Sequence, residues 1–506
     1  MNREYRRKKW VGLGLTIMIL IAAAVPAAGW NTTNENALFE MAGYQAQQVP
    51  EPTVSQSGGE WLIIALARSG VPVQEGYYEK YYRNVEKILK EKNGVLSSTK
   101  NTEYARVILA MTAIGKDPRN VAGYDLTLPL QDYSKTVRQG INGAIFALIA
   151  LNSGGYENSA EAKYLDYILS AQNKDGGFGL SPGSASGVDL TAMAVQALAP
   201  YAGEKKTGQA LEKALRFLAE KQTGEGGYSD GGQLNAESTA QVIIALRSSE
   251  KAWDDSLFPA ETEGMLDSLM GFEWACQGFS HLREPLNMDP MATEQGLLAL
   301  TAEYRCRWKT APLYDMTDGF TPAFKDTAGD PNRGKIFSMA EKGIINGKGN
   351  GVFDPKATMT RAEFATIVVR GLGLAQRSEK IFDDVAEGDW FYGYAAAAYR
   401  AGIVKGVSAT RFNPQGTITR QEALTMVARA ALQEKAADPV SEKEAEEILA
   451  LLRDGSQVSD WARVSVALCL KNGLAEEPAG QILPTERVKR SEIAGIIYNL
   501  YFKINE

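Results

Sequence analysis

The chain has 506 residues, of which 44% are hydrophobic and 23% are charged, as in folded globular proteins. A formal net charge of −7 argues against nucleic acid as the main partner. Three cysteines and one histidine exclude a disulfide-stapled scaffold, a two-histidine metal site and most histidine-based catalysis. The composition therefore favours a binding or structural protein, and we expect neither a metal nor a cofactor.

The first segment has the pattern of an export signal. Arginine and lysine residues at 3–9 precede an apolar run over 10–25, and small residues follow at 27–29. This order predicts a cleaved secretory signal peptide over residues 1–29. An uncleaved anchor is the alternative, but the run is shorter than the roughly 20 residues that a membrane helix needs. We expect an exported chain with no membrane contact after cleavage.

Residues 30–59 are rich in Asn, Gln, Pro, Ser and Gly, which predicts an irregular lead-in linker. From residue 60 to 315 the pattern changes to successive helices with an internal repeat. Three predicted helices share a threonine near their start and an Ala-Leu end, and they cover residues 189–198, 237–246 and 291–300. Their threonines, spaced by 48 and 54 residues, are Thr191, Thr239 and Thr293.

A glycine-rich turn precedes each of these helices. The turns lie at 172–179, 222–228 and 276–279, and their aromatic residues are Phe178, Tyr228 and Phe279. A period of about 50 residues corresponds to two helices and two connections. Because the later helix of each pair is rich in alanine and apolar around most of its surface, it needs burial on most sides. The sequence therefore predicts a mainly α fold, with an α/α toroid of five or six helical hairpins over residues 60–315.

The turns at 172–179 and 222–228 resemble those of the terpenoid-cyclase and protein-prenyltransferase toroid family. The chain lacks the Asp-x-Asp-Asp acid of the cyclases and, around His281, the zinc ligands of the transferases, so their activities are not implied. The stretches 112–117, 120–124 and 139–142 also resemble secreted toroid proteins that include the cobalamin carriers. That resemblance implies a hydrophobic or corrinoid ligand, although those carriers close over it with a β-rich domain that this chain replaces with helical modules.

The C-terminal region carries a second repeat. Units open at Phe324-Lys-Asp326, at 382–385 and at 458–460, and each ends with an Arg-x-Glu helix start. Thr360 and Thr419 are predicted N-caps, and the glutamates three residues later complete capping boxes. Each motif arginine then lies in a first helical turn, where an anion would find both a guanidinium and free backbone N–H groups.

These repeats are similar to S-layer homology modules. The resemblance predicts modules over 320–375, 378–432 and 458–506, with a spacer over 433–457. It implies that grooves between the modules bind a secondary cell-wall polysaccharide, often one that carries pyruvate. The site residues that it implies are the motif arginines and two aromatic residues: Arg361, Arg420, Arg490, Trp390 and Trp461.

Module one has Pro331 where the tryptophan would fall, and module three has Lys489 in place of the capping threonine. We therefore expect the grooves built from modules two and three to function. Two structural alternatives remain open. The arginines could form salt bridges at helix starts, and the tryptophans could pack in the core.

Several acids lie near the repeat turns and helix starts, namely Asp175, Asp189, Glu225, Asp230, Glu237 and Asp289. Stabilisation of helix N-termini explains them, and a carboxylate pair across the toroid mouth acting on a glycan is the alternative. His281 is expected to be incidental. Cys276 and Cys306 could pair, whereas Cys469 is predicted to be core.

The expected protein is exported to the cell wall or S-layer surface of a bacterium. Its modules anchor it non-covalently to wall polysaccharide, and its toroid binds an unidentified ligand without catalysis. The alternative is a wall-anchored enzyme that acts on glycans.

Overall fold

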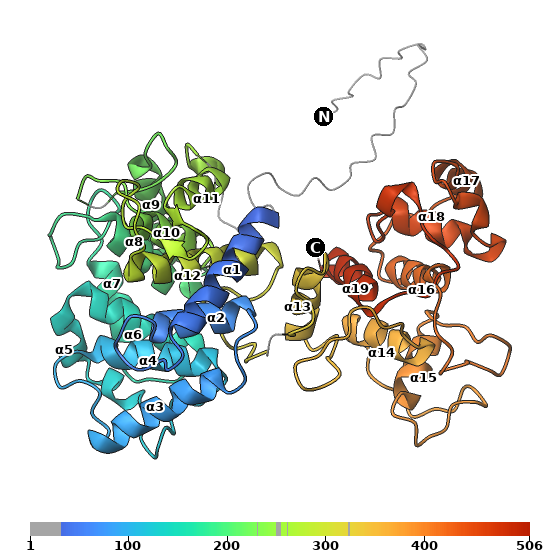
Figure 1. Cartoon of the computed structure of the whole chain (residues 1–506), viewed down its shortest axis with the longest axis horizontal. Coiled ribbons are helices and arrows are strands. Elements are labelled where there is room, and N and C mark those ends of the chain that lie inside the picture. The colour runs from blue at the N-terminus through green and yellow to red at the C-terminus, as the bar shows by residue number, and fades with distance from the viewer. Residues whose placement is uncertain (1–31, 230, 249–254, 261, 322–323, 506) are drawn as a thin grey trace, which may run out of the picture.

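The computed structural model describes residues 32–229, 231–248, 255–260, 262–321 and 324–505, and the predicted signal peptide lies outside them. The described chain is mainly helical, as predicted, and it forms an N-terminal toroid and a C-terminal group of repeats (Figure 1). One small antiparallel pair joins β1 (Glu273–Trp274) to β2 (Gly278–Phe279). No helix in the described ranges is long and apolar enough to cross a membrane.

A closed ring of helices forms the inside of the toroid. Each inner helix packs against the next along the chain, and the last packs against the first. Within the described residues the inner helices are α2 (Glu60–Ser69), α4 (Asn101–Ala113), α6 (Ile141–Ser153), α8 (Val188–Leu198), α10 (Ala236–Leu246) and α12 (Pro290–Arg307).

Outer helices alternate with the inner ones along the chain. They are α1 (Thr32–Gln48), α3 (Tyr77–Glu91), α5 (Tyr133–Thr136), α7 (Glu161–Ser170), α9 (Lys205–Lys221) and α11 (Thr262–Met270). The described residues thus make six hairpins, the upper of the two predicted values. The α/α toroid is confirmed.

The lead-in predicted over residues 30–59 differs from the structure, because α1 occupies most of it. Leu38 and Met41 of α1 are fully buried, and the helix packs against α12 and α2. Most of its Gln and Glu side chains are at least partly exposed, so the polar composition suggested a loop. The α1 helix is the outer member of the first hairpin.

The repeated turns are held by the repeated threonines. The hydroxyl oxygen of Thr191 accepts a hydrogen bond from the N–H of Phe178 at 2.9 Å, and Thr239 and Thr293 do the same for Tyr228 and Phe279 at 3.0 Å. All three aromatic rings are fully buried. The glycines make the turn possible, since Gly176 and Gly226 take positive φ angles.

The C-terminal region contains three copies of one unit, built on helices α13 to α19. These are α13 (Arg333–Glu341), α14 (Arg361–Gly371), α15 (Tyr392–Arg400), α16 (Arg420–Gln433), α17 (Glu442–Ala450), α18 (Arg463–Lys471) and α19 (Arg490–Asn505). The capping boxes predicted at Thr360 and Thr419 are present.

An aspartate opens each unit by accepting two backbone N–H groups of a loop that follows 27 to 29 residues later. Asp326 accepts those of Phe353 and Asp354, and Asp384 accepts those of Phe412 and Asn413. In the third unit the equivalent residue is Asp454, which accepts from the N–H groups of Ile482 and Leu483.

These hydrogen bonds place the start of the third unit at Asp454. That residue lies before the predicted start at 458 and inside the predicted spacer over 433–457. The remainder of that spacer is also folded, because α17 packs against α18. The Leu-Arg-Asp sequence at 452–454 replaces the Phe-x-Asp of the other two units, so the aromatic signal is missing there.

The three units close into a ring. Isolated β-bridges join Thr360 to Thr417, Thr419 to Arg487, and Thr358 to Lys489. They connect the first unit to the second, the second to the third, and the third back to the first. The result is a pseudo-threefold arrangement in which every unit touches both others.

The segment that joins the two regions crosses one end of the toroid. The Arg68 guanidinium, at the C-terminal end of α2, donates to the carbonyls of Leu313 and Pro312. The Met316 N–H donates to the Ser153 carbonyl at the end of α6. Leu313 and Met316 are buried in the toroid core. The segment therefore covers the C-terminal ends of α2 and α6.

Candidate functional sites

The motif arginines lie at the joints between units. Arg361, Arg420 and Arg490 begin α14, α16 and α19, and each donates its backbone N–H to a loop carbonyl of the next unit around the ring. Each residue is at most 8% exposed. The expected first-turn position is confirmed, but the arginines are more enclosed than an open anion site requires.

Two of the three guanidinium groups already have backbone partners. Arg361 Nε donates to the Phe412 carbonyl at 3.0 Å, and Arg490 donates to the carbonyls of Phe353 and Asn346 at 2.9 and 2.8 Å. Burial lowers the pKa of both arginines. Arg361 also forms a salt bridge with Glu422 at 3.4 Å, as the structural alternative expects, whereas the contacts given for Arg490 are to backbone carbonyls.

Arg420 differs from the other two. Its Nη2 donates to Glu492 Oε1 at 2.8 Å, whereas its Nε is buried and has no hydrogen-bond partner among the described residues. The third unit carries Ile482 where the others carry Phe353 and Phe412. This joint thus retains an unused donor.

The two tryptophans are exposed. Trp390 is 59% and Trp461 is 58% exposed, so core packing does not explain either side chain. Gln421 exchanges hydrogen bonds with Ser459, which places the start of α16 beside the segment that carries Trp461. The structure therefore brings Arg420 and Trp461 to the same joint, while Pro331 occupies the corresponding place in the first unit.

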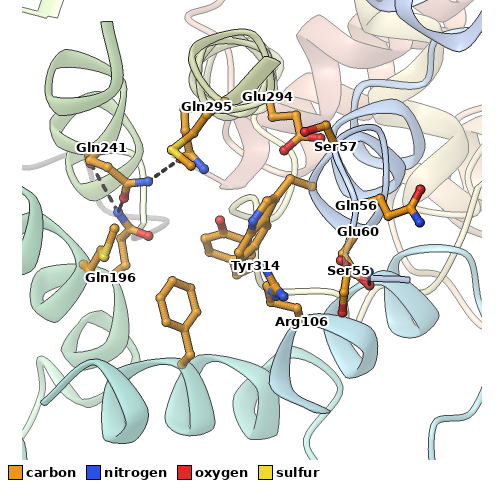
Figure 2. Close-up of a pocket in the computed structure, with 14 residues that line it drawn as sticks. Ser55, Gln56, Ser57, Glu60, Arg106, Gln196, Gln241, Glu294, Gln295 and Tyr314 are labelled. Atoms are coloured by element: carbon orange, nitrogen blue, oxygen red, sulfur yellow. Dashed lines mark hydrogen bonds between the residues drawn. The ribbon is translucent and has the colours of Figure 1, made fainter. Parts of the chain in front are cut away.

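A cavity of about 330 Å³ opens at the other end of the toroid, near the N-terminal ends of the inner helices (Figure 2). Its apolar lining consists of Trp61, Phe146, Met193, Met291 and Tyr314. Trp61 and Phe146 contact each other, with ring centroids 5.7 Å apart. Tyr314 comes from the segment that crosses the far end of the toroid, so that segment contributes to the cavity.

Three glutamine side chains form one wall of the cavity. Gln196 Nε2 donates to Gln241 Oε1 at 2.9 Å, and Gln241 Nε2 donates to Gln295 Oε1 (Figure 2). They come from α8, α10 and α12, three successive inner helices. The wall thus presents a connected row of amides.

Acidic residues line the opposite wall. Glu60 Oε1 accepts the Ser55 N–H at 2.9 Å, and Glu294 Oε1 accepts the Gly58 N–H at 2.5 Å. Burial raises the pKa of Glu294 to about 7, and the negative charge of Glu60 adds to that rise. Burial also raises the pKa of Glu60.

A second cavity of about 280 Å³ continues from the first. The two share Trp61, Arg106 and Phe146, and the second adds Glu103 and further polar side chains. Burial opposes ionisation of Glu103, but hydrogen bonds and charge from Ser55 and Arg106 leave its pKa below the usual range. Together the cavities form a groove in which aromatic rings lie between walls that carry polar groups.

The acids singled out in the sequence do not line either cavity. Asp289 caps α12 through the Ala292 N–H, Asp175 accepts the Gly177 N–H in its turn, and Glu225 pairs with Arg283. Asp189 lies in the first turn of α8, and Asp230 is outside the described residues. These contacts agree with the stabilising role expected for acids near turns and helix starts.

His281 bonds to Glu237 in the first turn of α10, with Nδ1 2.8 Å from Oε2, and neither residue lines a cavity. No disulfide joins Cys276 and Cys306, and Cys469 is buried as predicted. Within the described ranges, no group of three or more His, Cys, Asp or Glu side chains could hold a metal ion.

Glu60, Glu103 and Glu294 were not among the candidates predicted from the sequence. The available signal was a polar pair, Glu294-Gln295, inside a helix that is otherwise apolar on its inner side. Glu60 and Glu103 gave no such signal, because acids in a first helical turn are common.

Comparison with known proteins identifies the repeats. Residues 323–365 and 381–424 match the S-layer homology domain family. The chain is 36% identical over 139 residues to the surface-layer 125 kDa protein of Lysinibacillus sphaericus, which is 28% of this chain and 11% of that protein. It is 33% identical over 193 residues to an amylopullulanase of Thermoanaerobacterium thermosulfurigenes, which is 38% of this chain and 10% of that protein.

The chain thus spans only about a tenth of the length of these relatives. Its C-terminal region contains S-layer homology domains, and it is a secreted protein of the bacterial cell wall or S-layer surface.

Among solved structures, the chain is similar to protein geranylgeranyltransferase-I of Candida albicans, with a TM-score of 0.38 and 11% identity, covering 55% of this chain and 88% of that one. It is also similar to an unsaturated glucuronyl hydrolase of Bacillus sp. GL1, with a TM-score of 0.39 and 11% identity, covering 56% of this chain and 99% of that one. Likenesses at this level say nothing about activity.

Proposed function

We propose that the three units bind a secondary cell-wall polysaccharide non-covalently and thereby hold the toroid at the cell surface. The observation that carries this proposal is the joint between the second and third units. There an exposed indole, Trp461, lies near a buried guanidinium, Arg420, whose Nε has no protein partner among the described residues.

The chemistry of this joint suits an acidic glycan. An exposed indole ring offers an apolar face on which a sugar ring can stack while its polar edge stays wet. Charge-assisted bonds between a guanidinium and a carboxylate are stronger than neutral ones, and a carboxylate that entered this joint would find the buried Arg420 Nε without a protein partner among the described residues. A pyruvate-bearing polysaccharide supplies both a sugar ring for the indole and a carboxylate for the guanidinium. We propose the same role for Trp390 with Arg361, and the weakest binding where Pro331 replaces the tryptophan.

A wall-binding assay tests the anchor. Residues 32–506, with and without 320–506, are mixed with purified bacterial cell walls before and after mild acid removal of pyruvate, and the bound fraction is measured. We expect binding only when the C-terminal region and the pyruvate are both present. Binding that survives loss of residues 320–506 would contradict the proposal.

Point variants localise the effect. Trp461→Ala should weaken wall binding more than Trp390→Ala, because only the former removes the stacking face beside the unused Arg420 donor. Leu451→Ala removes another exposed apolar side chain, just before the third unit, and serves as the control. Equal binding by the Trp461→Ala and wild-type chains would assign the anchor to another surface.

For the toroid we propose a non-enzymatic role in ligand binding. The alternative, a glycan-active enzyme, draws support from Glu60 and Glu294, two carboxyl groups on one cavity with raised pKa values. Incubation with cell-wall glycans distinguishes the two. New reducing ends that appear with the wild-type chain and disappear with Glu294→Gln would favour the enzyme.

A further inference from the structure

The toroid cavity has a lining that is chemically mixed. Amides stand on one wall, carboxyl groups on the other, and aromatic rings between them (Figure 2). The amides of Gln196, Gln241 and Gln295 bond one another, but an apolar ligand would give no partner to their remaining donors and acceptors. An unpartnered buried polar group costs about 1–3 kcal/mol. The lining therefore disfavours a lipid or another hydrocarbon.

The charge of the cavity disfavours an anion. Glu60, Glu103 and Glu294 outnumber the basic residues of the lining, which are Lys100 and Arg106. Arg106 is already paired with Glu103. Helix N-termini ordinarily attract anions, but acidic residues in their first turns offset that attraction. Glu60 and Glu103 occupy those positions in α2 and α4. The cavity therefore differs from the arginine-bearing joints of the C-terminal units.

The size also limits the ligand. About 330 Å³ is near the lower end of small-molecule sites, and the adjoining cavity extends the space along Trp61 and Phe146. At this size the space does not suit a large corrinoid ring.

We propose that this toroid cavity binds a neutral oligosaccharide. Sugar hydroxyls both donate and accept hydrogen bonds, and they match the amide row and the carboxyl groups opposite. The C–H faces of sugar rings match Trp61, Phe146 and Tyr314. The proposal names a ligand class for the toroid and rests on its ligand-binding role, but it does not depend on the polysaccharide anchor.

Calorimetric titration of residues 32–506 tests the inference with soluble probes. The neutral probes are the trimers of glucose (β-1,4 and α-1,4), xylose and N-acetylglucosamine. Trigalacturonate is the anionic probe, and cyanocobalamin and dodecanoate represent the corrinoid and apolar ligands. Because no cell wall is used, failure of the anchor does not affect the result. We expect binding of at least one neutral trimer and none of the others.

Variants assign the binding to the cavity. Trp61→Ala and Gln241→Leu should each weaken it at least about tenfold, or about 1.4 kcal/mol. Trp61→Phe should recover much of the affinity, because it keeps an aromatic face. The matched controls Trp274→Ala and Gln74→Leu, outside both cavities, should bind within twofold of wild type. Thermal unfolding verifies that every variant is folded.

Three outcomes would overturn the inference. The first is a wild-type chain that binds none of the neutral trimers at millimolar concentration. The second is binding that Trp61→Ala and Gln241→Leu leave unchanged. The third is tighter binding of trigalacturonate, cyanocobalamin or dodecanoate than of any neutral trimer.

Discussion

At the residue scale, Glu294 is a cavity acid whose partly buried position changes its titration. It lies in the second turn of α12, accepts the Gly58 N–H and faces the charge of Glu60. Burial raises its pKa from 4.5 to about 7. The folded protein therefore holds a proton there that the unfolded chain releases at lower pH.

This difference makes stability depend on pH. Between about pH 4.5 and 7 the folded state binds more protons at Glu294 than the unfolded state, so this group lowers stability as pH rises through that window. Glu294→Gln removes the titration but keeps an oxygen that can accept the Gly58 N–H. We expect the variant to gain stability relative to wild type from pH 4.5 to pH 7.5, measured as thermal midpoints.

The control for this experiment is Glu157→Gln, which changes an exposed glutamate outside the cavity. Its midpoint should follow that of wild type at both pH values. A Glu294→Gln midpoint that keeps a constant offset from wild type would show that Glu294 ionises normally in the folded protein.

Sequence alone could not select Glu294. Asp289 lies five residues earlier in the same helix region and was a candidate for the same role, yet it caps the helix. Which of the two carboxyl groups reaches the cavity depends on the rotation of α12 about its axis. That rotation is fixed by contacts with α10 and α2, which are distant in sequence.

At the element scale, the helix starts of the three units differ in one respect. In α14 and α16 the capping threonine and the following glutamate bond each other's backbone. In α19 the Lys489 N–H donates to Glu492 at 2.9 Å, but lysine has no side-chain acceptor to return the bond. The third capping box is half complete.

Completing it should stabilise the protein. Lys489→Thr supplies a hydroxyl that can accept the Glu492 N–H, and a good N-cap contributes about 0.5–2 kcal/mol over alanine. We expect an increase in the free energy of unfolding within that range, measured by urea denaturation. Lys489→Ala is the control, because it removes the same lysine without adding an acceptor. If the two variants are equally stable, the hydroxyl makes no cap.

The elements were predictable where the sequence repeats a complete pattern. The glycine-aromatic turns and Thr-Arg-x-Glu starts predicted the toroid and the capping boxes, because each of these residues has a local role. The α1 helix and Asp454 were not predicted. The first has an exposed face crowded with polar residues, and the second follows a leucine where its counterparts follow phenylalanine.

At the scale of the whole molecule, a buried ionic cluster joins the toroid to the first unit. Arg305 of α12 is fully buried and pairs with Asp318 at 3.0 Å and with Glu341 of α13 at 2.9 Å. It also donates to the Arg68 carbonyl. Phe337 of α13 packs on Tyr304 in the same interface, with ring centroids 5.9 Å apart.

Removing the cation should be costly. Arg305→Met keeps much of the apolar stem but leaves the buried Glu341 carboxylate without this partner, while Asp318 keeps its bond to Arg68. Breaking a buried pair costs about 3–5 kcal/mol. We expect a loss of that size in urea denaturation. Arg83→Met, at an exposed residue of α3, should change stability by less than about 0.5 kcal/mol. A small loss for Arg305→Met would show that the cluster adds little.

Because the crossing segment makes the two ends of the toroid different, it limits how a polymer could bind there. Tyr314 lines the cavity, and Leu313 and Met316 are buried at the far end of the toroid. The cavity is therefore open at one end and closed at the other. A glycan cannot be threaded through it. A long glycan strand could place only its terminus or a short branch in the cavity. A bound ligand would have to leave through the opening by which it entered.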